Sequence, residues 1–349
     1  MIHLNYIIVG QGIAGSVLAW ELVQRRKKVL IFDPGNNNAT KVASGIINPI
    51  TGRNYVKTWM ADEVIPFAVN FYQNLEKKFK TDFFKSIPVC KLFYSAGNQN
   101  EWSLRSGNPE YSSFLSDKNI ILLDKSKVNN DFGAFGINNT YALNTIIFLT
   151  ALENYFLEKE TLIKASFDFD DLIIENNSIQ YKEIRADKII FCEGHLGKLN
   201  PFFNYLPFNP AKGESLHVKI NNYYNDRIIS GNYFTMPVGD DEYYLGSTNH
   251  WDFNNELPTE AGKNELTDGL KTLTPLPFSV NSHKAAIRPT VKDRKPLIGL
   301  HPANPRLCIF NGLGTKGISL APWFASHFAD FLEGDFPLLK EVNIERFLK

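Results

Sequence analysis

The chain has 349 residues, which is more than a single hydrophobic core usually holds, so we expect two domains or one domain with a large insertion. Lysine and arginine total 37, as do aspartate and glutamate, so the global charge offers no attraction to nucleic acid or to anionic membranes. No apolar run reaches the roughly 18 residues that a membrane-spanning helix needs, and the first residues lack a secretory pattern. We therefore expect a cytoplasmic protein.

The N-terminal segment predicts a dinucleotide-binding unit. An apolar run leads into the motif GQGIAG at residues 10–15, and a second apolar run ends at Asp33. Gly10 permits a tight turn, Gly12 lets a pyrophosphate approach the backbone, and Gly15 lets the following helix pack against the strand. The Asp33 carboxylate can accept hydrogen bonds from ribose hydroxyls and would repel a 2′-phosphate. This segment therefore predicts an adenine dinucleotide other than NADP, and it leaves NAD and FAD open.

The next segments alternate between helical and strand-like patterns. Residues 40–52 are rich in small side chains, which suits backbone that lies against a ligand. Residues 62–79 carry apolar side chains at helical spacing. Residues 83–139 consist of short apolar runs between polar breaks, a pattern typical of antiparallel strands, and we expect a second domain to begin there.

The middle of the chain returns to the first domain and then leaves it again. Asn144 is a candidate N-cap for a helix that ends near Leu157, and residues 172–181 have the pattern of a β-hairpin. Residues 188–192 form an apolar strand that runs into Gly194, another place where backbone can approach a cofactor. Between 207 and 284 the strand-like pattern recurs.

The C-terminal part contains two further motifs. Residues 306–311 are strand-like, GLGTKG at 312–317 is a second glycine loop, and a closing helix follows over 318–332. The loop offers free amides at a helix N-terminus, which stabilise negative charge such as that of a reduced flavin. Arg288 stands between an apolar residue and a proline; its fork can bind a carboxylate, and the residues alone favour a structural ion pair instead.

These patterns predict an α/β (α+β overall) fold with a discontinuous Rossmann-like domain and a second, antiparallel β-sheet domain. We expect residues 1–84, 142–206 and 284–349 in the first domain and residues 85–141 and 207–283 in the second.

Several chemistries are disfavoured. The three cysteines lie far apart without CxxC spacing, and the seven histidines do not cluster with other ligand types, so we predict neither a disulfide framework nor a metal site. No GxSxG motif appears, and Ser44 has no evident base partner, which argues against serine hydrolysis.

Taken together, the motifs resemble those of the D-amino-acid oxidase and glycine oxidase family of FAD-dependent oxidoreductases, which includes the flavin domain of a tRNA-modifying enzyme. The resemblance runs nearly end to end and is strongest in GQGIAG, Ala43-Ser44-Gly45, Lys212-Gly213-Glu214, LGST at 245–248, the Arg-Pro stretch at 288–299 and the second glycine loop. It implies FAD as the cofactor. By similarity, the FAD-binding residues are Gly10, Gly12, Ile13, Ala14, Gly15, Asp33, Thr40, Ser44, Gly45, Phe167, Gly194, Gly314, Thr315, Lys316 and Gly317.

The resemblance also implies the chemistry. Arg288 falls where the family binds a substrate carboxylate, which reverses the preference for an ion pair. The implied reaction transfers a hydride from an amine or amino acid to flavin N5 and gives an imine, with O2 or another acceptor reoxidising the flavin. Phe234 stands where the amino-acid oxidases usually carry a tyrosine, with Tyr233 directed to the other face of the strand. Asn249 stands where the resemblance leads us to expect an apolar residue that lines the pocket.

Three alternatives stay open at this point. The chain could be a tRNA-modifying flavoprotein that oxidises an aminomethyl uridine side chain, although its balanced charge makes nucleic acid an unfavoured partner. It could be an NAD-dependent dehydrogenase, or a flavin-binding protein without turnover.

Overall fold

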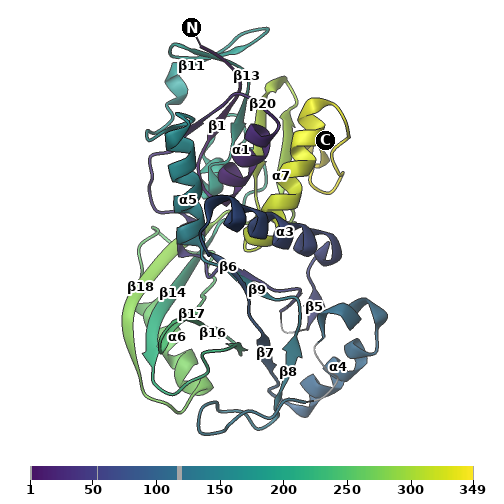
Figure 1. The fold of residues 1–349 in the computed structure, drawn as a ribbon, viewed down its shortest axis with the longest axis vertical. Helices are drawn as coiled ribbons and strands as arrows, with labels where there is room; N and C mark the ends of the chain where they lie inside the picture. Colours follow the sequence, from purple (N-terminus) through teal and green to yellow (C-terminus); the bar gives the residue numbers. More distant parts are fainter. Residues whose placement is uncertain (1, 53, 116–119, 349) are drawn as a thin grey trace.

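The computed structural model describes residues 2–52, 54–115 and 120–348. It has two parts, each built around a β-sheet, which lie one above the other along the long axis of the molecule (Figure 1). The upper part contains the first strand and the C-terminal helix, and the lower part contains the long strands of the middle of the chain. The sequence predicts this α/β fold with a second sheet. That sheet is antiparallel except for one parallel pair, between residues 228–230 and 89–91.

The first sheet is mixed, with the strand order β10-β2-β1-β13-β12-β11, and β20 pairs with β13 and β19. Its strands β1, β2, β10, β13 and β20 run parallel. The C-terminal halves of the two central strands are apolar because both faces of the sheet are covered there; Ile7, Ile8, Ile189 and Ile190 are fully buried. The strands are β1 (Ile2–Val9), β2 (Val29–Phe32), β10 (Leu162–Ile163), β11 (Leu172–Ile174), β12 (Ile179–Tyr181), β13 (Ile184–Phe191), β19 (Leu297–His301) and β20 (Asn304–Asn311).

Helices cover this sheet as the sequence predicts. Most residues of α1 (Ile13–Gln24) are buried because it packs beside α7 (Gly317–Glu333) in the upper part of the molecule (Figure 1). Helix α5 (Thr145–Glu158) starts at the predicted N-cap: the Asn144 side chain accepts a hydrogen bond from Ile147 N. Helix α3 (Ala61–Phe79) packs against α7, and a short helix, α2 (Ala39–Val42), precedes it.

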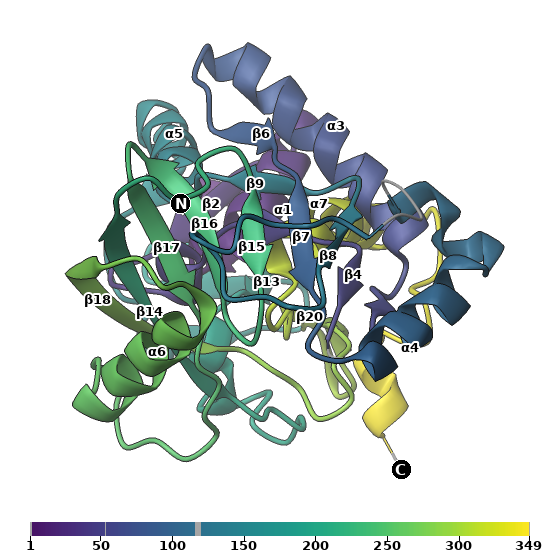
Figure 2. The same ribbon diagram turned by 90° about the horizontal axis from the view of Figure 1, so that it is seen from below.

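The second sheet has the order β18-β14-β17-β16-β15-β7-β8, and Figure 2 shows it from below with α6 (Glu260–Leu273) along it. Leu266 and Leu270 of α6 are fully buried in the cluster that includes Leu216 and Val218 of the sheet. The strands are β7 (Val89–Leu92), β8 (Ala134–Ile137), β14 (Ala211–Ile220), β15 (Ile228–Ser230), β16 (Phe234–Gly239), β17 (Glu242–Gly246) and β18 (Phe278–Arg288).

Two expectations about this part need correction. Residues 83–139 and 207–284 contain not only strands but also the helices α4 (Ala96–Ser106) and α6. In addition, β18 pairs with β14 as far as Arg288, so the second sheet extends past the expected boundary at residue 284. The long strand β18 thereby carries the chain from the second sheet back to the first.

Smaller elements join the two parts. Strands β3 (Ile46–Ile47), β6 (Phe84–Ser86) and β9 (Tyr141–Leu143) form a small sheet, and β4 (Ile50–Thr51) pairs with β5 (Val56–Lys57). The 3-10 helices are η1 (Pro109–Phe114), η2 (Phe169–Asp171), η3 (Gly194–Lys198) and η4 (Ile344–Phe347). Among the helices in the described ranges, none combines the length and apolar character required to cross a membrane.

Candidate cofactor and substrate site

The first glycine turn connects β1 to α1. Gly10 has a φ of +100°, and a Cβ there would lie 2.6 Å from the Cys192 carbonyl oxygen, which follows the neighbouring strand β13. A Cβ on Gly15 would lie 1.8 Å from the Gly10 carbonyl oxygen, whereas one on Gly12 would approach no atom closer than 3.6 Å. Gly10 and Gly15 thus allow the close packing of turn, strand and helix, and Gly12 leaves the backbone open to a ligand.

The N-terminus of α1 is suited to an anion. Gly12 at the N-cap makes no side-chain cap, and the first turn contains no acidic residue, so the positive end of the helix dipole is not neutralised within the helix. The Ile13 amide donates to Thr40 Oγ1 at 3.0 Å, which brings α2 to the same turn. Ala14, in the first turn of the helix, is buried.

Asp33 lies at the edge of this turn, directly after β2. Its carboxylate accepts hydrogen bonds from the Gln11 amide at 2.6 Å and from the Gly35 amide at 2.7 Å. These contacts hold the carboxylate beside the glycine motif. Phe167 lies nearby: its ring is 5.9 Å from that of Phe32, the last residue of β2, and it stacks on Tyr181 at 4.3 Å.

Ser44 and Gly45 follow α2 and lead into β3. Gly45 has a φ of +76°, and a Cβ there would lie 1.9 Å from the Leu143 carbonyl oxygen, so this position requires glycine for the pairing with β9. Ser44, the preceding residue, is partly exposed.

The second glycine loop contacts both the first glycine turn and the segment that follows β13. A Cβ on Gly317, the first residue of α7, would lie 3.0 Å from the Ile13 side chain, so the N-termini of α1 and α7 are in contact. The Asn311 side chain, at the end of β20, donates to Gly194 O at 2.9 Å and accepts from the Gly312 amide at 2.8 Å. The ends of β1, β13 and β20 are therefore brought together, each followed by glycine.

Lys316 is the N-cap of α7. Burial lowers the pKa of its ammonium group to about 8, and its Nζ donates to Thr58 Oγ1 at 3.2 Å. Within residues 2–52, 54–115 and 120–348, no carboxylate forms an ion pair with it. The neighbouring Thr315 is exposed and Gly314 has a φ of +55°. This loop therefore offers amides and a cation to a negatively charged group.

Glu193 is a second partly buried titratable group near the glycine loops, and the sequence did not single it out. It stands between Cys192 and Gly194, and burial raises the pKa of its carboxyl group to about 7, against a hydrogen bond from Asn200 Nδ2 at 2.6 Å that lowers it.

Arg288 ends β18 and points its guanidinium at a turn that follows β17. Nη2 donates to Ser247 Oγ at 2.7 Å, and Nη1 donates to Thr248 O and to Asn249 Oδ1, both at 3.0 Å. In the part of the chain that is described, Arg288 forms no ion pair, and burial lowers the pKa of its guanidinium, which stays charged at neutral pH. The expected alternative, a structural ion pair, is therefore not what holds this side chain.

Two features join Arg288 to the rest of the site. Gly213 on β14 leaves the space that the guanidinium fills, since a Cβ there would lie 2.0 Å from Nη2. Pro289, the next residue, accepts a hydrogen bond from the Gly314 amide at 3.3 Å. Because of that bond, the candidate substrate-binding arginine and the second glycine loop are adjacent.

The structure also shows a phenol that sequence reasoning missed. Phe234 stacks on Tyr244 with ring centroids 5.6 Å apart, and the Tyr244 hydroxyl interacts with Ser215 and Ser247, beside Arg288. Tyr233 points away toward α6, as expected, and donates to Glu265 Oε1 at 2.5 Å. A tyrosine on the adjacent strand therefore lies near the arginine although residue 234 is phenylalanine.

Three features fit a phosphate-bearing flavin cofactor: the open glycine turn, the helix N-terminus with no acidic residue in its first turn, and a lysine that forms no ion pair with any described residue. A model of the family described as FAD-dependent oxidoreductase matches residues 5–331. The chain belongs to this family. FAD is therefore its cofactor, which decides between FAD and NAD. The contacts of individual residues with FAD remain predictions.

Known proteins similar to this chain extend over nearly its whole length. Glycine oxidase of Bacillus subtilis is 24% identical over 98% of this chain and 95% of that protein. The bifunctional protein MnmC of tRNA 5-methylaminomethyl-2-thiouridine biosynthesis from Marinobacter nauticus is 24% identical over 93% of this chain, which spans only 54% of that protein. The crystal structure of glycine oxidase from Bacillus cereus superposes with a TM-score of 0.79 at 18% identity, covering 96% of each chain.

Proposed function

We propose that this FAD-dependent oxidoreductase oxidises an amine that carries a carboxylate, such as an amino acid. The observation behind the proposal is the guanidinium of Arg288, which is surrounded by neutral acceptors and, among the described residues, has no acidic partner. A partly buried cation of this kind favours a ligand that brings its own negative charge. Glycine oxidase, which is similar over nearly the whole chain, acts on such a compound by its name.

The hydrogen-bond inventory of Arg288 defines how a carboxylate would bind. A guanidinium has five N–H groups, and three of them are used by Ser247, Thr248 and Asn249. Since both hydrogens of Nη1 are occupied, the donors left to a substrate are Nε and the remaining hydrogen of Nη2. Asn249 directs Oδ1 to the arginine, so its amide hydrogens are available as further donors.

The chain's own residues have a limited task in this reaction. When bound, FAD supplies a hydride acceptor at N5. The substrate amine, in its neutral form, loses a hydride from its α-carbon and a proton from nitrogen and becomes an imine, which water hydrolyses. Arg288 holds the carboxylate and thereby orients the α-carbon, while the second glycine loop and Lys316 provide a positive environment where negative charge accumulates.

The test is anaerobic reduction of the bound flavin, followed by its absorbance, with glycine, sarcosine, proline and D-amino acids, each paired with the amine that lacks the carboxylate. We expect bleaching by at least one carboxylate-bearing amine, and a drop of about 100-fold or more in kcat/KM in Arg288→Met. Absence of bleaching across the panel would sink the amino-acid hypothesis. Measurement of oxygen uptake during turnover then shows whether O2 or another electron acceptor reoxidises the flavin.

A second candidate is oxidation of an aminomethyl group on a tRNA base. The similarity to MnmC, over 93% of this chain, favours it. The equal numbers of acidic and basic residues weigh against it, because tRNA affinity depends on clustered cations. A gel shift with tRNA that disappears as salt rises would support this candidate, and a protein that retains FAD but is bleached by no substrate would point to a binding module instead.

We also propose a cytoplasmic location. Cys90, Cys192 and Cys308 are free and buried, as is usual for proteins of a reducing compartment.

A further inference from the structure

Strand β14, which packs against Arg288 on one face, carries a buried ion pair on its other face. Lys212 and Glu214 of β14 are 3% and 1% exposed, and their charged groups are 3.4 Å apart. They flank Gly213, whose missing side chain makes room for the guanidinium. Because side chains alternate along a strand, the pair lies on the opposite face from Arg288. Nothing in the reaction proposed above uses this pair.

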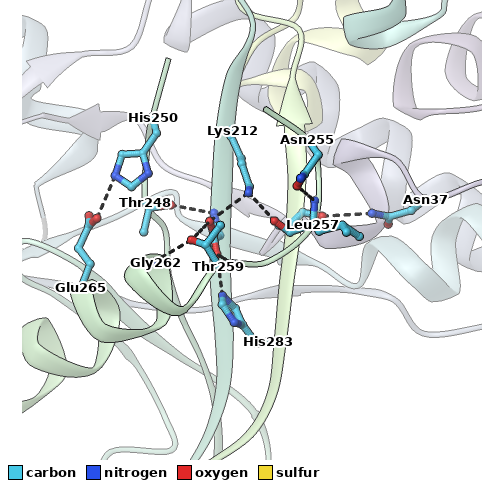
Figure 3. Close-up of polar contacts among 12 residues, drawn as sticks. Asn37, Lys212, Thr248, His250, Asn255, Leu257, Thr259, Gly262, Glu265 and His283 are labelled. Atoms are coloured by element: carbon cyan, nitrogen blue, oxygen red, sulfur yellow. Dashed lines mark hydrogen bonds and ion pairs between the residues drawn. The ribbon is translucent and has the colours of Figure 1, made fainter. Parts of the chain in front are cut away.

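The two residues of the pair hold both ends of one loop, which we name the strap and define as residues 247–259. Their side chains hold its far end and their backbone holds its near end. At its far end, Lys212 Nζ donates to Leu257 O, and Glu214 accepts from Thr259 N and from Thr259 Oγ1, both at 2.8 Å. Thr259 in turn caps α6 through the Gly262 amide. Figure 3 shows Lys212, Leu257 and Thr259 meeting beside β14.

The near end of the strap is held by the backbone of the same two residues. The Glu214 amide donates to Thr248 Oγ1 at 2.9 Å, and Thr248 N donates to Glu214 O at 3.1 Å. Lys212 and His250 exchange backbone hydrogen bonds of 2.7 and 2.9 Å. His250 is also paired with Glu265 of α6 at 2.9 Å (Figure 3).

In the part of the chain that the structure describes, the strap supplies all three acceptors of the Arg288 guanidinium. Ser247 Oγ, Thr248 O and Asn249 Oδ1 all come from its first three residues. A shift of these residues would therefore turn the guanidinium and redirect its free N–H edge.

We propose that the Lys212–Glu214 pair is a positioning device, which fixes the strap and through it the direction in which Arg288 presents its free donors to a carboxylate. This inference rests on the proposed function. A buried ion pair adds little net stability compared with apolar residues, but removal of one partner leaves an uncompensated charge. The pair thus contributes by defining geometry. Glu214 Oε2 also lies 2.8 Å from His283 Nε2, so side chains from β14, β18 and the end of the strap surround the carboxylate.

The experiment compares holoenzymes of the wild type, Lys212→Met, Glu214→Gln and the control Val218→Ala. Val218 is on the same strand and the same face, fully buried in the apolar cluster and remote from the polar contacts of the strap. Glu214→Gln keeps an oxygen acceptor for Thr259, so it tests the same inference if Lys212→Met does not fold. The readouts are FAD content, the Kd of acetate with acetamide as its neutral counterpart, KM against kcat for a bleaching substrate, and hydrogen exchange of the Thr248 and His250 amides.

We expect the Lys212 and Glu214 variants to retain FAD, to bind acetate about tenfold or more weakly and to raise KM by a similar factor, while kcat changes by less than about twofold. Their Thr248 and His250 amides should exchange faster than in the control. Acetate affinity and exchange equal to those of Val218→Ala would overturn the inference. If acetate does not bind to the wild type and Arg288→Met has no effect, the proposed function fails, and the exchange rates still decide whether the pair fixes the strap.

Discussion

Gly213→Ala is the sharpest single test of the arrangement around Arg288. The added methyl carbon would lie 2.0 Å from Nη2, 2.2 Å from Cζ and 2.5 Å from Nη1. Ordinary van der Waals contact begins at 3.4 Å, so the guanidinium must withdraw by about 1.4 Å. Strand β14 is hydrogen-bonded to β18 on one side and to β17 on the other, so we expect the arginine side chain to move while the strand keeps its position.

The size of the effect follows from this displacement. Overpacking of this kind costs about 1–3 kcal/mol of stability. Misplacement of a substrate-orienting group by about 1 Å can cost on the order of 100-fold in rate. We therefore expect kcat/KM for the carboxylate-bearing substrate to fall by about 10- to 100-fold, with FAD content unchanged because Gly213 lies outside the glycine turns.

The assay is anaerobic flavin reduction in stopped flow over a range of substrate concentrations, with thermal unfolding measured beside it. Gly239→Ala is the matched control: the residue is on β16 of the same sheet, and its Cβ would be 3.7 Å from the nearest atom, Glu242 Cβ. If Gly213→Ala reduces flavin with the kinetics of Gly239→Ala, the guanidinium does not need the space behind it and the reasoning fails.

Three further predictions concern other parts of the site. Gly15→Ala places a methyl 1.8 Å from Gly10 O and should reduce bound FAD to below about a tenth of the wild-type content, measured by absorbance of the purified protein; normal content would contradict the packing role. Glu193→Gln should remove a pH dependence of the free energy of unfolding. The folded-state pKa of the Glu193 carboxyl, about 7, lies above the usual 4.5, so the wild-type protein is most stable below pH 4.5. It loses up to about 3 kcal/mol of unfolding free energy as pH rises through 7. Urea midpoints of wild type and variant that run parallel between pH 4.5 and 8 would refute it. Asn249→Asp puts a carboxylate where Oδ1 accepts from Arg288 at 3.0 Å, so it should pair with the arginine and weaken acetate binding about tenfold, whereas an unchanged Kd would show that the arginine is not the binding group.

The parts of the fold that depend on neighbours in sequence could be predicted. The strand, glycine turn and helix at the N-terminus depend on a contiguous pattern, and the same holds for the Asn144 cap and the hairpin of β11 and β12. The helices α4 and α6 could not, because their sequences favour loops. Helix α4 is polar and packs mainly through Trp102, which stacks on Phe135 at 3.5 Å.

Helix α6 contains two glycines that weaken helix propensity but are required by its partners. A Cβ on Gly262 would lie 2.5 Å from the Glu214 carboxylate, and one on Gly269 would lie 2.3 Å from the Tyr233 ring. Tertiary contact has overridden local preference here. The glycine that makes the helix hard to predict, Gly262, is also the residue that lets α6 pack against the Glu214 carboxylate of the buried ion pair.

The candidate site divides in the same way. The glycine motifs and Arg288 have local signatures, whereas Tyr244, Ser247 and the strap reach Arg288 only through strand pairing between segments some forty residues apart. Period-two alternation on β14 is what connects them: Gly213 and Ser215 face the arginine and the phenol, while Lys212 and Glu214 face the strap. A change of register by one residue would turn Gly213 and Ser215 toward the strap and Lys212 and Glu214 toward Arg288, and the contacts on both faces would be lost. The function of this strand is therefore expected to depend on its register against β17 and β18 more than on any one of its side chains.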